Sequence, residues 1–493
     1  MTGQPKSNAS LAGLEARFRR ELELLTLPPA KDWLEPRVHP RHGPVLDVAV
    51  IGAGMAGLAA AFALKCLAVR NLRVFDRAPE GLEGPWATTA RMETLRSPPE
   101  LTGPAFGFAS LTFRAWFEAQ FGAEAWGTLY RIPRLQWMDY LRWYRRMIDV
   151  PVENGTELID MRGDEELVVL TLRAAGGTRT IAARRVVLAT GRDALGGPYT
   201  PKMFRGLDRA HVMHSLEEID FAKLRSKRIG VLGAGATATD SAAAALEAGA
   251  ARVAMLVRRA DVPRINKSMG IGSVGFWNGF YRLADAEKLA IIEYIDGAAV
   301  PPPRNSMLRC TRHENFSILA SCVTRAASVR DGRVLLETTR GRLAFDALIL
   351  ATGLTVDWSE RPELTALKPH VLLWRDRFRP GGRADYAQAE HPYLGPAFEF
   401  IARDGGAPWV SRVHCFNFAA NLSHGQISGD IPGISIGAER VAQGVAAALF
   451  AEDYARTWTR LNDWSNPELR GDEYELAADA GKFLANEPAD ART

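Results

Sequence analysis

Apolar residues along this chain gather in runs that predict alternating strands and helices. Residues 45–51 form an apolar run of strand length, and an alanine-rich segment of helix length, residues 55–65, follows it. A second short run, Leu72–Phe75, ends at Asp76. Strand, helix and strand in this order predict the opening of a doubly wound α/β domain with a parallel sheet.

The same order of elements returns in the segment "RIGVLGAGATATDSAAAALEAGAARVAMLV", which begins at Arg228. Two further apolar runs, residues 184–192 and 345–357, each reach an Ala-Thr-Gly triplet, as strands buried on both faces do. One lies before the segment that begins at Arg228 and the other after it. We therefore expect one α/β domain of this kind to be inserted in another. The first would span residues 45–195 and 335–493, and the second residues 196–334, after a lead-in at residues 1–44.

Two other patterns predict helices. Leucine and phenylalanine side chains share one face of residues 10–25, which predicts an amphipathic helix instead of a signal peptide. Residues 105–148 are dense in aromatic side chains, which predicts an inserted helical layer whose rings pack as core. The alternative for these rings is the lining of a pocket for a flat ligand.

Composition narrows the class of protein. A length of 493 residues allows two to three domains, and a net charge of +4 without a dense basic run argues against nucleic acid as a partner. The four cysteines form no C-x-x-C pair and no metal-ligand spacing, which favours a reducing compartment and no metal site. The glycine pattern and Lys65 make residues 48–69 a strand, turn and helix instead of a membrane span. We expect a soluble, cytoplasmic protein that does not associate with membranes.

The first glycine loop carries the chemistry of a dinucleotide site. Gly52, Gly54 and Gly57 follow the G-x-G-x-x-G pattern between a strand and a helix. Such glycines allow a tight turn, the approach of a pyrophosphate to the backbone, and close helix packing. Asp76 ends the next strand, where a carboxylate accepts hydrogen bonds from ribose hydroxyls.

The second loop has Gly233 and Gly235, with Ala238 in the third position. The strand after its helix ends in Arg258 and Arg259, where the first domain has an acid. Guanidinium groups can chelate a 2′-phosphate, so this pair predicts NADPH binding. The alternative is a solvated pair of surface charges.

Two dinucleotide sites on one chain indicate a bound flavin and a nicotinamide that delivers hydride to it, with FAD in the first loop and NADPH in the second. The paired loops, the segment "GPWATT" at residues 84–89 and the two Ala-Thr-Gly strands resemble the class B flavin-dependent monooxygenases over residues 45–449. The resemblance implies that Trp86 lies near the flavin, with a packed loop anchor as the alternative. It also implies that residues 416–450 contact the flavin, with Asn417, Asn421 and Asp430 as polar contacts.

The family resemblance implies an NADPH- and O2-dependent monooxygenase that oxygenates a small organic molecule through a flavin C4a-hydroperoxide. A reductase that passes electrons to another acceptor and a non-catalytic flavin-binding redox sensor are the alternatives. Residues 204–215 do not match the spacing of the Baeyer–Villiger signature, and the asparagine of amine- and sulfide-oxidising members is absent after Trp86. Catalytic residues, the oxygenated atom (N, S or carbon) and the oligomeric state therefore stay open.

The segment "SMGIGSVGFWNGFYRLAD", residues 268–285, mixes glycines with large aromatic residues. Such a composition is typical of a mobile apolar lid, and we expect this segment to form part of a substrate entrance. The alternative is a surface excursion packed on the second domain.

Overall fold

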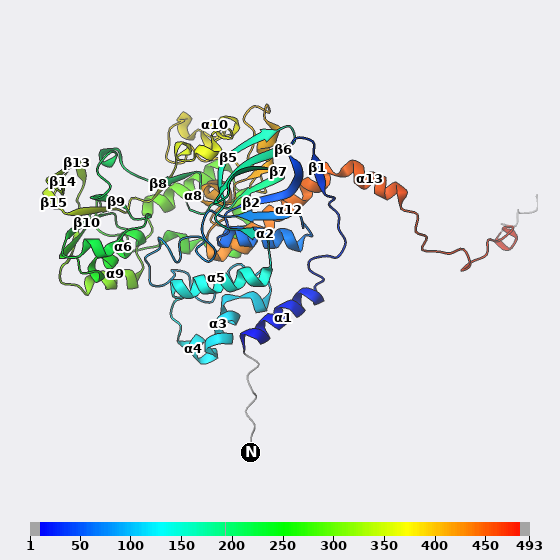
Figure 1. The fold of residues 1–493 in the computed structure, drawn as a ribbon, viewed down its shortest axis with the longest axis horizontal. Coiled ribbons are helices and arrows are strands. Elements are labelled where there is room, and N and C mark those ends of the chain that lie inside the picture. Colours follow the sequence, from blue (N-terminus) through cyan, green and yellow to red (C-terminus); the bar gives the residue numbers. More distant parts are fainter. Residues whose placement is uncertain (1–9, 193, 484–493) are drawn as a thin grey trace, which may run out of the picture. The chain divides into compact units, whose positions relative to one another are not determined.

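The computed structural model describes residues 10–192 and 194–483, which divide into two compact units between Leu449 and Phe450. The first unit carries all the described sheets and both glycine loops (Figure 1). It has the predicted fold class, an α/β protein with two Rossmann-like sheets, one of them inserted between strands of the other.

The sheet that carries the first glycine loop has the order β4-β3-β2-β7-β6-β5. Its parallel strands are β2 (Gly43–Ile51), β3 (Leu72–Phe75), β4 (Val152–Glu153) and β7 (Gly177–Leu188), and β18 (Val413–His414) also pairs with β7 in parallel. The antiparallel strands are β1 (Arg37–His39), β5 (Glu157–Asp164) and β6 (Leu167–Ala174). The predicted strands at residues 45–51 and Leu72–Phe75 are confirmed.

Helix α2 (Met55–Cys66) packs against β2 and β7 on one side and against α5 (Arg134–Ile148) on the other (Figure 1). Its first ten residues are all buried. A helix that is apolar on every side is stable only when it is enclosed in this way. The N-terminus of α2 is thereby fixed at the carboxyl end of the central strand.

The aromatic-rich segment forms α3 (Phe113–Phe121), α4 (Ala123–Thr128) and α5. Trp137, Tyr140 and Trp143 of α5 are almost completely buried, as the core interpretation predicts. Helix α1 (Leu11–Leu24) closes this layer, because the Trp143 indole N–H donates to Glu15 Oε1 at 3.1 Å. The predicted N-terminal helix and the helical insertion are confirmed.

The sheet that carries the second loop has the order β12-β11-β10-β16-β9 and is parallel throughout. Its strands are β9 (Val212–His214), β10 (Arg228–Leu232), β11 (Arg252–Leu256), β12 (Phe316–Leu319) and β16 (Ala347–Leu350). A meander of β13 (Thr324–Arg330), β14 (Arg333–Thr338) and β15 (Gly341–Phe345) precedes β16. The helices of this region are α6 (Ala236–Glu247), α7 (Val274–Gly279), α8 (Asp285–Ala298) and α9 (Arg304–Thr311).

Two crossings connect the sheets. They pair as an antiparallel ribbon of β8 (Gly196–Pro198) and β17 (Leu354–Val356). The first crossing follows the predicted boundary at residue 195, whereas the return follows β16 instead of residue 334. The apolar sequence of β16 predicts a strand but does not indicate the sheet to which the strand belongs. In the structure β16 pairs with β10 and β9, so it belongs to the second sheet.

The chain after β17 contains α10 (Trp374–Arg377), β18, α11 (Asn421–His424) and α12 (Ile434–Glu452). By length and composition, one described helix, at Ile431–Glu452, could cross a membrane. Its Ile434, Val441 and Val445 side chains are buried in the main core, as in a core helix of a globular protein. In the second unit, α13 (Tyr454–Asp463) exposes Trp458 and Leu461.

Candidate functional site

The first glycine loop lies at the carboxyl end of β2 and leads into α2. Gly52 has a φ of +104°, and a Cβ there would lie 2.4 Å from the carbonyl oxygen of Ala189. A Cβ on Gly57 would lie 1.7 Å from the Gly52 carbonyl oxygen, so the helix packs directly on the loop. At Gly54 the nearest atom would be Gly84 Cα, 4.0 Å away. A tight turn, an open approach and close helix packing are the three properties that the glycine motif requires.

The second loop repeats this geometry at the end of β10. Gly233 has a φ of +147°, and a Cβ there would lie 2.5 Å from the carbonyl oxygen of Ala351. Gly235 again faces open space, with the Val300 carbonyl oxygen as the nearest atom at 3.9 Å. Ala238 is completely buried in the third position, where its methyl group fits.

The two Ala-Thr-Gly segments have equivalent places beside the two loops. Ala189 N–H donates to the Ile51 carbonyl at 2.8 Å, and Ala351 N–H donates to the Leu232 carbonyl at 2.9 Å. Each alanine thus extends the strand that neighbours the one ending in a glycine loop. Its carbonyl oxygen lies next to the first glycine of that loop. The two loops therefore have the same arrangement.

The helices behind both loops begin without a side-chain cap. The N-cap residues of α2 and α6 are Gly54 and Gly235, which have no side chain to accept the first amide hydrogens. The first-turn amides and the positive end of the helix dipole are therefore available to an anion. Both sites fit a pyrophosphate group, in the way that dinucleotide-binding helices do.

Asp76 directly follows β3 and lies beside the first loop. Its Oδ2 accepts from Ala53 N–H at 2.6 Å, and its Oδ1 accepts from Ala78 N–H at 2.7 Å. The carboxylate therefore fixes the glycine loop and the turn after β3. A contact of Asp76 with ribose stays a prediction, because these two amides already use one lone pair on each oxygen.

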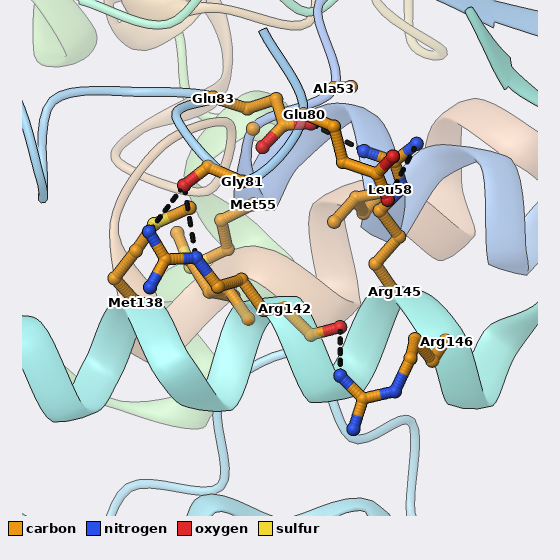
Figure 2. Close-up of a pocket in the computed structure, with 12 residues that line it drawn as sticks. Ala53, Met55, Leu58, Glu80, Gly81, Glu83, Met138, Arg142, Arg145 and Arg146 are labelled. Carbon is orange, nitrogen blue, oxygen red and sulfur yellow. Dashed lines mark hydrogen bonds and ion pairs between the residues drawn. The ribbon is translucent and has the colours of Figure 1, made fainter. Parts of the chain in front are cut away.

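A cavity of about 290 Å³ opens at the first loop, and Figure 2 shows arginines of α5 on its border. Arg142 donates from Nε and Nη2 to the Gly81 carbonyl at 3.0 and 2.7 Å. Arg145 pairs with the buried Glu83 at 2.5 Å, and Met55 also lines the cavity. These arginines were not predicted, because their spacing of three residues places them on one helical face but does not indicate what that face packs against.

Trp86 lies partly buried against the aromatic layer. Its ring is edge-on to that of Trp137, with the centroids 6.4 Å apart, and its carbonyl accepts from Arg134 Nη1 at 2.5 Å. These contacts match the packed anchor that was the alternative for Trp86. The proposed place beside a flavin stays a prediction.

The two arginines after β11 differ in their contacts. Arg259 Nη2 donates to the Gly297 carbonyl of α8 at 2.7 Å. Arg258 is exposed, and among the described residues its guanidinium has neither a hydrogen bond nor an ion pair. Of the two side chains, Arg258 therefore has all its guanidinium N–H donors available to a ligand.

The C-terminal segment that was predicted to contact the flavin packs on the end of β7. The Asn417 side chain donates to the Leu188 carbonyl at 3.1 Å and to Thr190 Oγ1 at 3.2 Å. These bonds give the buried Asn417 a structural role. Asp430 lies just before α12, keeps exposed surface, and is nevertheless surrounded by protein, so that burial raises the pKa of its carboxyl group.

Residues 268–285 are attached to the first domain at their C-terminal end. Phe280 is buried, and Arg440 of α12 donates to the Trp277 carbonyl at 3.1 Å. The Arg440 guanidinium also lies 4.1 Å from the centre of the Tyr281 ring. Met269 at the other end of the segment is 69% exposed. The segment is thus fixed at one end and open at the other, and its role as an entrance stays a prediction.

The cysteines and the possible metal ligands of the described residues concern two predictions made from the sequence. All four cysteines are free, and three are buried. Burial raises the pKa of Cys66 to about 11 and that of Cys310 to about 12, which leaves thiols of low reactivity at neutral pH. The described residues contain no group of three metal-ligating side chains.

Comparisons with known proteins agree with this geometry. The sequence profile of the pyridine nucleotide-disulphide oxidoreductase family matches residues 46–270. The chain is 39% identical over 447 residues to the "FAD-dependent urate hydroxylase" of Xanthomonas campestris pv. campestris, an alignment that covers 90% of this chain and 94% of that protein.

Two solved structures have the same fold over most of the chain. The ornithine hydroxylase of Pseudomonas aeruginosa has a TM-score of 0.64 at 15% identity, with 82% of this chain and 100% of that chain covered. The ornithine N-hydroxylase of Kutzneria sp. 744, in a structure with reduced FAD, NADP⁺ and L-ornithine, has a TM-score of 0.62 at 16% identity, with 82% and 100% covered.

Proposed function

This chain belongs to the class B flavin-dependent monooxygenase family, and on that premise we propose that it uses FAD, NADPH and O2 to hydroxylate a small heteroaromatic substrate of the urate type. The observation that carries the proposal is the duplicated loop, since two uncapped helix N-termini behind two glycine turns provide for two dinucleotides. The relative with 39% identity supports the substrate class.

In this proposal the first loop holds FAD. Gly52, Gly54 and Gly57 allow the pyrophosphate to reach the first-turn amides of α2. Arg142 and Arg145 of α5 line the cavity beside it, where Arg145 is paired with Glu83. When bound, FAD supplies the two-electron chemistry that reduces and activates oxygen.

Three further side chains complete the FAD site in this proposal. Asp76 holds the glycine loop through Ala53 and offers its remaining lone pairs to the ribose. Trp86 forms a wall between the flavin and α5. Asp430 lies at the flavin end of the site, ahead of the N-terminus of α12.

The second loop holds NADPH in this proposal. Gly233, Gly235 and Ala238 provide the turn, the open approach and the close helix packing. Arg258 and Arg259 lie at the end of β11, where a guanidinium recognises the 2′-phosphate. A carboxylate at this place would repel that phosphate.

We expect Arg258→Ala to lose much of the preference for NADPH over NADH. One charge-assisted contact contributes about 1.5–3 kcal/mol, so kcat/KM for NADPH should fall roughly ten- to a hundredfold while the value for NADH stays unchanged. Arg259→Ala should have a smaller effect, because that side chain also bonds to Gly297. Arg264→Ala, which removes an exposed arginine paired with Asp261, is the matched control. Unchanged discrimination in the Arg258→Ala, Arg259→Ala double variant would assign NADPH recognition to other residues.

The function itself is tested with purified protein, NADPH, urate and isotopically labelled oxygen. The expected result is a yellow protein that oxidises NADPH faster with urate present and transfers one labelled oxygen atom to the product. NADPH oxidation that needs a quinone, and leaves urate unlabelled, would instead support the reductase alternative. A disulfide-reducing version of that alternative has no C-x-x-C pair to work with, because the four cysteines are Cys66, Cys310, Cys322 and Cys415.

A further inference from the structure

Residues 91–96, which we call the strap, belong to the first domain. The Leu95 N–H donates to the Ile132 carbonyl at 2.8 Å, and the Arg134 N–H donates to the Glu93 carbonyl at 3.0 Å. The Leu95 side chain is buried in the main core of that domain. The backbone of the strap is therefore fixed against the start of α5.

The polar side chains of the strap bind the second domain instead. Arg91 donates to the carbonyls of Ser215 and Glu217, which follow β9. Asn305 of α9 donates from Nδ2 to Thr94 Oγ1 at 3.0 Å. One short backbone segment thus carries contacts to both domains.

The end of the strap lies beside the second glycine loop. Arg96 Nη2 donates to the Pro301 carbonyl at 2.8 Å. The preceding residue, Val300, supplies the carbonyl oxygen nearest to a Cβ placed on Gly235, at 3.9 Å. The chain ahead of the strap starts beside the first loop, where Gly84 Cα is the atom nearest to the open side of that loop. The strap and the residues before it therefore connect the two glycine loops.

Arg309 of α9 joins the strap to α6, the helix behind the second loop. Its Nη1 donates to the Arg91 carbonyl at 3.1 Å, and its Nε lies 3.6 Å from Glu93 Oε1. Its Nε and Nη2 donate to the Glu247 carboxylate of α6 at 3.0 and 2.8 Å, and Asp240 Oδ1 of the same helix lies 3.6 Å from its Nη1. Only 7% of the Arg309 side chain is exposed. A buried guanidinium with several partners holds them in one geometry, because its fork is planar and rigid.

This geometry matters for a reaction that needs both loops. Hydride transfer from NADPH to FAD moves two electrons and one proton together and gives NADP⁺ and anionic reduced FAD. A displacement of about 1 Å between the reacting groups can lower such a rate by about a hundredfold. Helix α6 begins at the second loop, so a contact that fixes α6 against the strap also fixes this loop relative to the first domain.

We propose that Arg309 and Asn305 are positioning residues for hydride transfer from NADPH to FAD. They act through the strap and α6, which keep the two glycine loops at one distance and orientation. Breaking these contacts should therefore slow the reduction of FAD without weakening the binding of either dinucleotide. The inference rests on the proposed function, because it assumes FAD at the first loop and NADPH at the second.

The test compares Arg309→Met with Arg312→Met in the FAD-containing protein. Arg312 is the matched control, because it binds the same Glu247 carboxylate at 2.7 Å and, among the described residues, has no hydrogen bond or ion pair with the strap. Flavin reduction is followed without oxygen after mixing with NADPH in the presence of urate. FAD content, NADP⁺ affinity and the long-wavelength absorption that arises when NADP⁺ stacks on reduced flavin are measured on the same samples.

Arg309→Met should lower the rate of flavin reduction at saturating NADPH by about ten- to a hundredfold. Its FAD content and NADP⁺ affinity should equal those of the wild type, whereas the long-wavelength absorption should weaken because the two rings no longer stack well. Arg312→Met should match the wild type in every measurement. Reduction by dithionite, which does not use the second domain, should be equally fast in all the variants.

The hydrogen bond between Thr94 and Asn305 provides a second test that leaves the buried ion pairs in place. Thr94→Val and Asn305→Ala should each slow reduction by NADPH by about two- to tenfold, as expected for the loss of one hydrogen bond. The double variant should be no slower than the slower single variant, because both substitutions remove the same bond. This pair decides the question if Arg309→Met does not fold.

Several results would overturn the inference. Wild-type reduction rates in Arg309→Met and in the Thr94→Val, Asn305→Ala double variant would do so and leave the proposed function intact. An equal loss of rate in Arg312→Met would assign the effect to the packing of α9 on α6. A loss of NADP⁺ affinity as large as the loss of rate would make Arg309 part of the NADPH site. Wild-type protein that contains no FAD, or that NADPH does not reduce, would contradict the proposed function and this inference with it.

Discussion

Gly54→Val is expected to give a folded protein that no longer retains FAD. A Cβ at this position meets no atom of the chain closer than Gly84 Cα at 4.0 Å, and the φ of −68° is open to any residue. The valine methyl groups would instead occupy the space over the N-terminus of α2, where the pyrophosphate has to lie. FAD affinity should fall by roughly a hundredfold or more, since each 1.4 kcal/mol of lost binding energy is about tenfold. The ratio of flavin to protein absorbance measures the loss.

Variants at two other glycines serve as controls that distinguish loss of FAD binding from loss of the folded structure. Gly176→Val places the same side chain in open space on an exposed turn, and it should keep FAD. Gly57→Ala would put a Cβ 1.7 Å from the Gly52 carbonyl oxygen, so this variant should lose its folded structure. Gly54→Val protein with full FAD occupancy would refute the assignment of this loop to the flavin.

Arg184→Leu is expected to destabilise the first domain by about 3–5 kcal/mol, as the loss of one partner of a buried ion pair does. Arg184 of β7 is completely buried and donates to Asp47 Oδ1 of β2 at 3.0 Å and to the Leu449 carbonyl at 3.2 Å. Leucine would remove the guanidinium that binds the buried Asp47 carboxylate at 3.0 Å. Urea unfolding monitored by tryptophan fluorescence measures the change.

A surface ion pair provides the comparison for Arg184. Arg342→Leu breaks a pair with Glu337 whose side chains are 88% and 58% exposed, and it should change stability by about 0–1 kcal/mol. The Asp47→Leu, Arg184→Leu double variant should recover part of the loss, because it removes the buried carboxylate together with the guanidinium. Equal stability of Arg184→Leu and Arg342→Leu would mean that the buried pair contributes nothing.

The glycine loops could be predicted from the sequence because their requirements are local. Gly52 and Gly233 each adopt a positive φ against a carbonyl oxygen, and only glycine tolerates both conditions. The strands and helices around them follow from apolar runs of suitable length. The aromatic layer was also predictable, because so many large rings in one segment must be buried.

Other features depend on tertiary packing that no local pattern contains. Arg142 and Arg145 reach the first loop only because the inserted helix α5 crosses beneath α2 (Figure 1). Asp76 was predicted at the end of a strand, but its bonds to Ala53 and Ala78 depend on how the loop closes. The apolar run of β16 predicts a strand, whereas its pairing with β10 decides the sheet to which it belongs.

Strand β18 is synthesised long after β7, the strand with which it pairs, and this order affects which edges are exposed during synthesis. Val413 and His414 pair with Val186 and Val187 of β7, beyond the point where the β6 ladder ends at Ala183. Until residue 414 has been synthesised, this stretch of β7 is an unpaired apolar edge, of the kind that joins other chains. The whole second sheet is made in that interval and has to fold as a unit of its own. A nascent chain stalled before β18 should therefore be a better substrate for chaperones than one stalled just after it.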